Sequence, residues 1–211
     1  MSVIFDPNCR LCPRLANFLD EVGEQYPDYF ARPVPAFGDD SAQLLVVGLA
    51  PGMHGANATG RPFTGDHAGV LLYETLYRNG FSTGPDSVSS DDDLKLINCR
   101  ITNAVKCLPP QNKPVASEIN NCRPFLKQEL QGLAAGSVIV ALGSIAHKTV
   151  VAALGLRQKD FKFSHAAEYD LSNQLTLLDS YHCSRYNTQT RRLTEPMFNH
   201  VFERARILID G

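Results

Sequence analysis

Short apolar runs of strand length alternate with longer segments of helical spacing after residue 43, and this alternation limits the possible folds more than any other feature. A run that is apolar at every position, such as 44–49, predicts a strand buried on both faces. Such strands separated by helices are typical of a parallel sheet with helices on both faces, so we expect an α/β fold. The predicted strands are 44–49, 101–105, 137–142 and 175–178, and the predicted helices are 69–79, 115–133, 144–154 and 195–209, the last with Thr194 as its N-cap.

The size and composition of the chain predict one soluble domain. With 211 residues, of which 44% are hydrophobic, the chain is long enough to bury a core, and we expect a single domain over 1–211. No apolar stretch approaches the roughly 20 residues of a membrane-spanning helix, and no secretory signal opens the chain, so we expect no membrane association and a cytoplasmic setting. In that setting, six cysteines indicate metal binding or catalysis before disulfides.

The formal net charge of −2 lacks the basic excess that is typical of nucleic-acid-binding proteins. Any contact with a phosphate backbone must therefore use a local patch, and basic residues do gather at Arg185, Arg191 and Arg192. Acidic charge gathers at 91–93, three consecutive aspartates that we interpret as a solvated loop. Two segments rich in proline, glycine, serine or aspartate are predicted to be loops, 27–40 and 82–93.

The position of the strands predicts where a ligand binds. In an open parallel sheet, ligands bind beyond the carboxyl ends of the strands. The segment that leaves the first strand is rich in glycine, as phosphate-binding and tight turns are. The segments predicted to meet at this rim are 50–66, 103–106, 143–144 and 181–192.

Four of the cysteines form two pairs that are suited to one metal centre. Cys9 and Cys12 are spaced C-x2-C, while Cys107 follows a predicted strand and Cys122 lies inside the next helix. Four thiolates suit either zinc or an iron–sulfur cluster, although buried free cysteines are also common. Of the two remaining cysteines, Cys99 is predicted to be a core residue.

Three segments resemble motifs of one known family. Segment 48–66, GLAPGMHGANATGRPFTGD, resembles the first motif of the family 5 uracil-DNA glycosylases, and segment 180–188, SYHCSRYNT, resembles their last motif. Segment 103–112, with Cys122 downstream, resembles the cluster-binding segment of families 4 and 5. The resemblance implies a three-layer α/β/α fold with a central four-stranded parallel sheet. It also implies a [4Fe–4S] cluster in a supporting role, held by Cys9, Cys12, Cys107 and Cys122.

The same resemblance implies a monomeric DNA-repair enzyme that hydrolyses the N-glycosidic bond of uracil, and of deaminated bases such as hypoxanthine and xanthine, leaving an abasic site in DNA. Such an enzyme must draw the base out of the duplex, stack it, read its edge and stabilise it as it leaves. His182 is then expected to donate to uracil O2, and Asp66 to hold the attacking water. Phe63 is expected to stack on the base, and Asn103 is expected to pair with its edge. The implied substrate-binding residues are Ala50, Gly52, Phe63, Asn103, Ser184, Arg185, Tyr186 and Asn187.

Alternatives stay open for the whole chain and for single residues. A family 4 enzyme restricted to uracil is a close alternative, although Ala50 stands where family 4 carries an acidic residue. A non-catalytic iron–sulfur protein that binds nucleic acid is the alternative from another class. Asp66 is also suited to capping a helix, since aspartate is a favoured N-cap. We do not expect Cys183 to be a nucleophile, because it lacks an orienting partner. We do not expect cleavage of the DNA strand, because neither the first nor the last motif has a lysine that could form a Schiff base. The one reservation is Lys106, in the cluster-binding segment.

Overall fold

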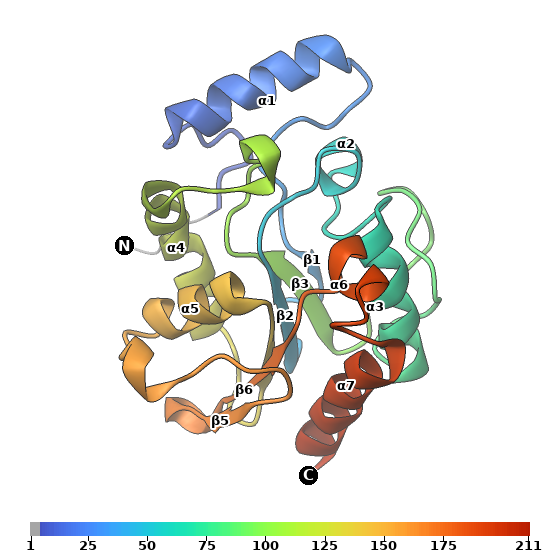
Figure 1. Ribbon diagram of the computed structural model, residues 1–211, viewed down its shortest axis with the longest axis vertical. Helices are drawn as coiled ribbons and strands as arrows, with labels where there is room; N and C mark the ends of the chain where they lie inside the picture. Colours follow the sequence, from blue (N-terminus) through green and yellow to red (C-terminus); the bar gives the residue numbers. More distant parts are fainter. Residues whose placement is uncertain (1–4) are drawn as a thin grey trace.

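The computed structural model describes residues 5–211 and is built around one mixed sheet with helices on both sides (Figure 1). The strand order is β1-β3-β2-β4-β6-β5. Four neighbouring strands run parallel: β3 (Cys99–Asn103), β2 (Leu44–Gly48), β4 (Val138–Leu142) and β6 (Thr176–Ser180). These strands match the four predicted ones to within two residues at each end, so the α/β class and its central parallel sheet are confirmed.

Two short strands that we did not predict extend the sheet at its edges. β1 (Phe37–Gly38) pairs antiparallel with β3, and β5 (Glu168–Asp170) pairs antiparallel with β6. β1 lies in segment 27–40, which was predicted to be a loop. Strands of two or three residues show too little alternation for a sequence pattern to detect.

Successive residues of the central strands face opposite helical layers, which explains why these strands are apolar throughout. Leu44 and Val46 of β2 pack in one hydrophobic cluster with α3 and α7, whereas Leu45 and Val47 pack in another with α4 and α5. The two pairs of helices lie on opposite sides of the sheet in Figure 1, so the three-layer α/β/α architecture is confirmed. The covering helices are α3 (His67–Arg78), α4 (Ala116–Gln131), α5 (Ser144–Ala153) and α7 (Glu195–Asp210).

A third hydrophobic cluster lies outside the sheet and holds the N-terminal helix. Helix α1 (Pro13–Gln25) buries Leu15 and Leu19 in this cluster, together with Leu108 and Phe125. The packing brings α1 beside α4 and the loop that follows β3. The remaining helical segments are α2 (Ala56–Thr59), α6 (Arg185–Gln189) and the 3₁₀ turns Pro110–Asn112, Gln158–Asp160 and Ser172–Gln174.

The helix ends follow local capping signals. Thr194 caps α7 as predicted, because its side chain accepts a hydrogen bond from the Met197 amide at 3.4 Å. Asp66 and Ser184 cap α3 and α6 in the same way. Every helix within residues 5–211 is too short or too polar to cross a lipid bilayer.

Candidate active site

A cavity of about 700 Å³ lies at the carboxyl edge of the parallel strands. Its lining comes from three of the four predicted rim segments, 50–66, 103–106 and 181–192, together with neighbouring residues such as His67 and Asn112. The fourth predicted rim segment, 143–144, lies directly behind the lining residue His182. A Cβ at Gly143 would be 3.5 Å from the Cβ of His182. The predicted site residues that line the cavity are Ala50, Gly52, Phe63, Asp66, Asn103, His182, Ser184 and Arg185.

The register of the sheet brings Phe63 and Asn103 together at Gly48. Gly48 and Asn103 are paired at the ends of β2 and β3. A Cβ at Gly48 would lie 2.6 Å from Phe63 Cζ and would overlap Asn103 Oδ1, so only glycine leaves room for both side chains. Asn103 is 3% exposed, and its Oδ1 has no hydrogen-bond partner within residues 5–211. Because buried amide oxygens nearly always have a partner, this atom is an acceptor available to a ligand in the cavity.

His182 lies opposite Phe63, two residues beyond the end of β6. The two rings are 5.9 Å apart between centroids and inclined by 29°. Burial lowers the pKa of His182 to about 4, so the imidazole is neutral at neutral pH and has one N–H donor and one acceptor nitrogen. The Asn187 side chain holds the backbone here, donating from Nδ2 to the His182 carbonyl at 2.8 Å.

Asp66 divides its two carboxylate oxygens between helix α3 and the cavity. Oδ1 accepts a hydrogen bond from the Gly69 amide at 2.8 Å, so Asp66 is the N-cap of α3. Oδ2 faces the turn before α2, where a Cβ at Gly55 would lie 2.7 Å from it. Burial raises the pKa of Asp66, and the hydrogen bonds from the backbone of α3 offset only part of that rise. The capping alternative is thus confirmed, and the water-holding role stays a prediction for the second oxygen.

The segment after β6 contains a short helix that the sequence analysis did not predict. Ser184 accepts a hydrogen bond from the Asn187 amide at 3.4 Å and starts helix α6 at Arg185. Arg185 lines the cavity, whereas Tyr186 projects into solvent with 71% of its surface exposed. The structure therefore brings Ser184 and Arg185 to the cavity and leaves Tyr186 and Asn187 outside its lining. Cys183 is fully buried, and burial raises the pKa of its thiol, which leaves it protonated and unsuited to nucleophilic attack.

The four paired cysteines line one small cavity between α1 and α4. Two hydrogen bonds reach their sulfur atoms: the Lys106 amide donates to Cys122 Sγ at 3.3 Å, and Asn121 Nδ2 donates to Cys12 Sγ at 3.6 Å. All six cysteines of the chain are free thiols. Within residues 5–211, no three Cys, His, Asp or Glu side chains are close enough to hold a single metal ion. Four thiols around one cavity are a ligand set that suits either zinc or an iron–sulfur cluster.

Two other side chains settle questions that the sequence left open. Cys99 is fully buried in β3, so its prediction as a core residue is confirmed. Lys106 is 2% exposed, and its Nζ pairs with Glu129 Oε1 at 2.9 Å on the side of the sheet covered by α4. The Lys106 amine is therefore not among the groups that line the cavity.

One part of the site was missed in the sequence. Arg61 is buried and forms an ion pair with Asp92, which lies in the loop that we interpreted as solvated. That interpretation is correct for Asp91 and Asp93, which are exposed, and wrong for Asp92. Since 31 residues separate Arg61 from Asp92, no local pattern marks the pair.

The fold, the cavity at its carboxyl edge and the thiol site define a class of enzymes that act on bases in DNA, the uracil DNA glycosylase superfamily. The family model described by that name matches residues 35–206, and the chain belongs to this superfamily. Within it, the chain belongs to the type-5 uracil-DNA glycosylases. It is 48% identical to the Type-5 uracil-DNA glycosylase of Thermus thermophilus over 208 residues, which cover 95% of this chain and 93% of that protein.

Two further relatives separate the types. The Type-5 uracil-DNA glycosylase of Pyrobaculum aerophilum is 41% identical over 94% of this chain and 88% of its own length. The Type-4 uracil-DNA glycosylase of the same organism is 37% identical over only 61% of this chain and 58% of its own length. The full-length matches to type 5 confirm the family 5 assignment over the family 4 alternative.

Proposed function

We propose that this protein is a monofunctional DNA-repair glycosylase that hydrolyses the N-glycosidic bond of uracil in DNA and leaves an abasic site. The observation that carries the proposal is the buried Asn103 Oδ1, which has no partner within residues 5–211 and lies beside Phe63 in the cavity wall. An amide there pairs with the uracil edge, accepting from N3–H and donating to O4. The names of the relatives agree with this substrate.

His182 stabilises the base as it leaves. As the glycosidic bond breaks, negative charge develops on uracil O2, and a neutral imidazole donates a hydrogen bond to that oxygen. The lowered pKa of His182 keeps this donor uncharged before the reaction, as in other enzymes that polarise a carbonyl with a neutral histidine. Catalysis depends chiefly on this interaction, because Ala50 has no polar group with which to activate water.

Asp66 Oδ2 and the backbone of the Gly52–Gly55 turn hold the attacking water. The carboxylate also stabilises the cationic sugar that forms as the base departs. Asp66 Oδ1 accepts a hydrogen bond from the Gly69 amide, and this bond restrains the whole carboxylate. The orientation of Asp66 Oδ2 toward the cavity is thereby fixed.

The DNA backbone is contacted around α6. Arg185, at the mouth of the cavity, and the exposed Tyr186 enter the gap left by the flipped base, and Ser184 and Arg191 hold phosphates. The chain has a small net negative charge, so these local contacts supply the electrostatic part of binding.

The four thiols fit a [4Fe–4S] cluster, with Cys9, Cys12, Cys107 and Cys122 as its ligands. They line one cavity, and N–H donors reach two of the sulfur atoms, as expected around cluster ligands. Burial, with the neighbouring thiols adding to it, raises the pKa of Cys107, so this thiol stays protonated unless a metal takes the place of its proton. A cluster held there would add no step to the hydrolysis and would join the start of α1 to α4 and to the loop that follows β3.

The cavity also has the size to admit other deaminated bases. Its volume of about 700 Å³ leaves room for a purine, and the wall at Ala50 and Met53 is apolar. We therefore extend the proposal to hypoxanthine and xanthine, with the length of the Met53 side chain as the opposing feature. The monomeric state and the cytoplasmic setting stay predictions.

The experiment is excision from a duplex with one uracil, followed by alkali to cleave at abasic sites. Asn103→Ala should lower the single-turnover rate by about a hundredfold or more, the usual loss of one positioned hydrogen-bonding group. Asn17→Ala, which changes an exposed asparagine of α1, is the matched control and should act as wild type. Binding to the duplex without any abasic product would favour the non-catalytic alternative.

A further inference from the structure

Phe63, the residue assigned to stack on the base, has an unfavourable backbone conformation. Its φ is 54°, in the left-handed region that crowds the Cβ of every residue except glycine. The ring is buried against Gly48, and the Phe63 carbonyl oxygen lies so close to Gly69 of α3 that any Cβ there would overlap it. Such a conformation persists only where the surrounding contacts hold the chain in place.

Polar contacts hold the residues on both sides of Phe63. Tyr73 of α3 donates from its hydroxyl to the Pro62 carbonyl at 2.8 Å. On the other side, Thr64 Oγ1 lies 2.7 Å from Ser87 Oγ. Thr64 and Tyr73 are fully buried, so little water competes for these hydrogen bonds. Ser87 is therefore one contact through which the distant loop 82–93 restrains the turn.

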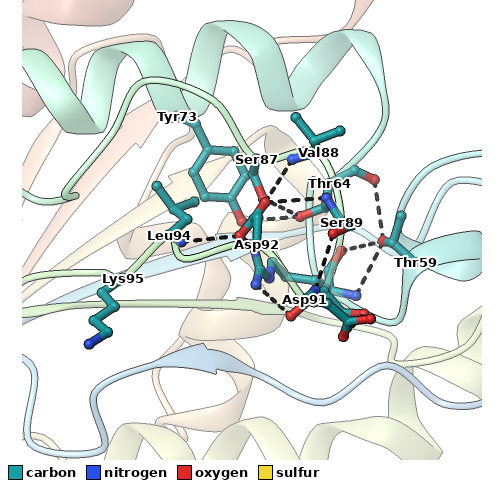
Figure 2. Close-up of polar contacts among 12 residues, drawn as sticks. Thr59, Thr64, Tyr73, Ser87, Val88, Ser89, Asp91, Asp92, Leu94 and Lys95 are labelled. Atoms are coloured by element: carbon teal, nitrogen blue, oxygen red, sulfur yellow. Dashed lines mark hydrogen bonds and ion pairs between the residues drawn. The ribbon is translucent and has the colours of Figure 1, made fainter.

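Asp92 holds Ser87 in position. Arg61 donates to Asp92 Oδ1 at 2.5 Å and to Ser87 Oγ at 3.1 Å, while Asp92 Oδ2 accepts from the Val88 and Ser89 amides at 2.9 and 3.2 Å. Figure 2 shows Asp92, Ser87 and Thr64 meeting beside Tyr73. The Asp92 carboxylate thus binds Arg61 and closes its own loop at the same time.

The surroundings of Asp92 favour its charged form. Burial acts against the charge, but hydrogen bonds from Arg61 and from three backbone amides outweigh it, so the pKa of Asp92 lies below its usual value. Arg61 is itself only 5% exposed, and its guanidinium carbon lies 4.3 Å from the centre of the Phe37 ring. A buried guanidinium that loses its carboxylate is costly, so removing the Asp92 charge disturbs the whole contact.

We propose that Asp92 is a positioning residue for the excision reaction, acting through Arg61 and Ser87 to keep the Phe63 ring in its stacking position. This inference rests on the proposed function, since it assigns the stacking of the flipped base to Phe63. Without the carboxylate, the loop releases Ser87, and Thr64 loses the shortest of its side-chain hydrogen bonds. Phe63 then relaxes from the left-handed conformation, and its ring leaves Gly48.

The test is a double-mutant cycle between Asp92→Asn and Phe63→Ala, measured by single-turnover uracil excision. Asp92→Asn in the wild-type background should lower the rate about tenfold to a hundredfold, the range expected when a reacting partner is misplaced by about 1 Å. In the Phe63→Ala background it should have no further effect. Asp91→Asn and Asp93→Asn are the matched controls, because both neighbouring aspartates are exposed, and should act as wild type.

The cycle separates positioning from general stability. A merely structural role would lower the folded fraction equally in both backgrounds, so rates are corrected for folded protein from thermal unfolding. If Asp92→Asn does not fold, Ser87→Ala takes its place, since it removes the shortest hydrogen bond of Thr64 Oγ1 and keeps the ion pair. Equal loss of rate in both backgrounds, or none in either, would overturn the inference alone. Absence of excision by the wild-type protein would overturn the proposed function as well.

Discussion

The neutral imidazole of His182 predicts a loss of stability on mild acidification. Burial lowers its pKa from 6.5 to about 4, so between these values the unfolded chain binds a proton that the folded protein does not. Because the unfolded state binds more protons, the free energy of unfolding falls as the pH falls through this window. The stabilisation that His182 contributes is complete only above pH 6.5. Between about pH 7.5 and about pH 5, these two pKa values give a loss of about 2 kcal/mol.

Urea unfolding at those two pH values measures the loss. His182→Ala has no imidazole to protonate, so its free energy of unfolding should change by about 2 kcal/mol less than that of the wild type. His200→Ala removes an exposed histidine of α7, with 72% of its side chain accessible, and should follow the wild type. The same pH dependence in wild type and His182→Ala would refute the half-buried, neutral imidazole and the donor state on which the mechanism depends.

Five further predictions concern the chemistry, the metal site and the binding of DNA. His182→Ala should lower single-turnover excision by about 10² to 10³, and should change binding to an abasic product far less. The purified protein should be yellow-brown, with broad absorption near roughly 400 nm; a colourless protein with one zinc would contradict the cluster. Cys107→Ser should reduce the yield of folded protein more than the rate per folded molecule. DNA affinity should fall with salt, and Arg185→Ala or Arg191→Ala should weaken it alike for all sequences. Duplexes with uracil, hypoxanthine, xanthine or thymine should show excision of uracil and a deaminated purine but not of thymine; excision of uracil alone would contradict the permissive pocket.

The sequence was sufficient for the parts of the fold that are set by local burial. Runs such as Val138–Leu142 are apolar at every position because both faces of the strand are covered, and that pattern needs no knowledge of the partner strands. Strand β5 escaped prediction because it has only three residues, of which Glu168 and Asp170 are exposed, so it shows no apolar run. Helix α6 was missed because it has only five residues and no buried side chain.

The same distinction applies to the site. Phe63, Asn103 and His182 were predicted through motifs that lie at strand ends, where the topology of the sheet brings them together. Asp92 was misjudged because its partner is Arg61, and the two meet only when the loop folds over the turn that holds Phe63. Three aspartates in a row look equivalent in the sequence, and only the tertiary contact distinguishes the middle one.

The glycines beneath the cavity divide it into a fixed part and an adjustable part, a division that matters to anyone who wants to redesign the enzyme. Side chains cannot be added at Gly48, which lies against Phe63, or at Gly55, which lies against Asp66. Ala50 and Met53 line the same cavity and pack toward the hydrophobic cluster of α1, so the wall that they form is built from side chains. New base preferences, whether evolved or engineered, must therefore arise on this wall, where a side chain can change while Gly48 and Gly55 stay as they are.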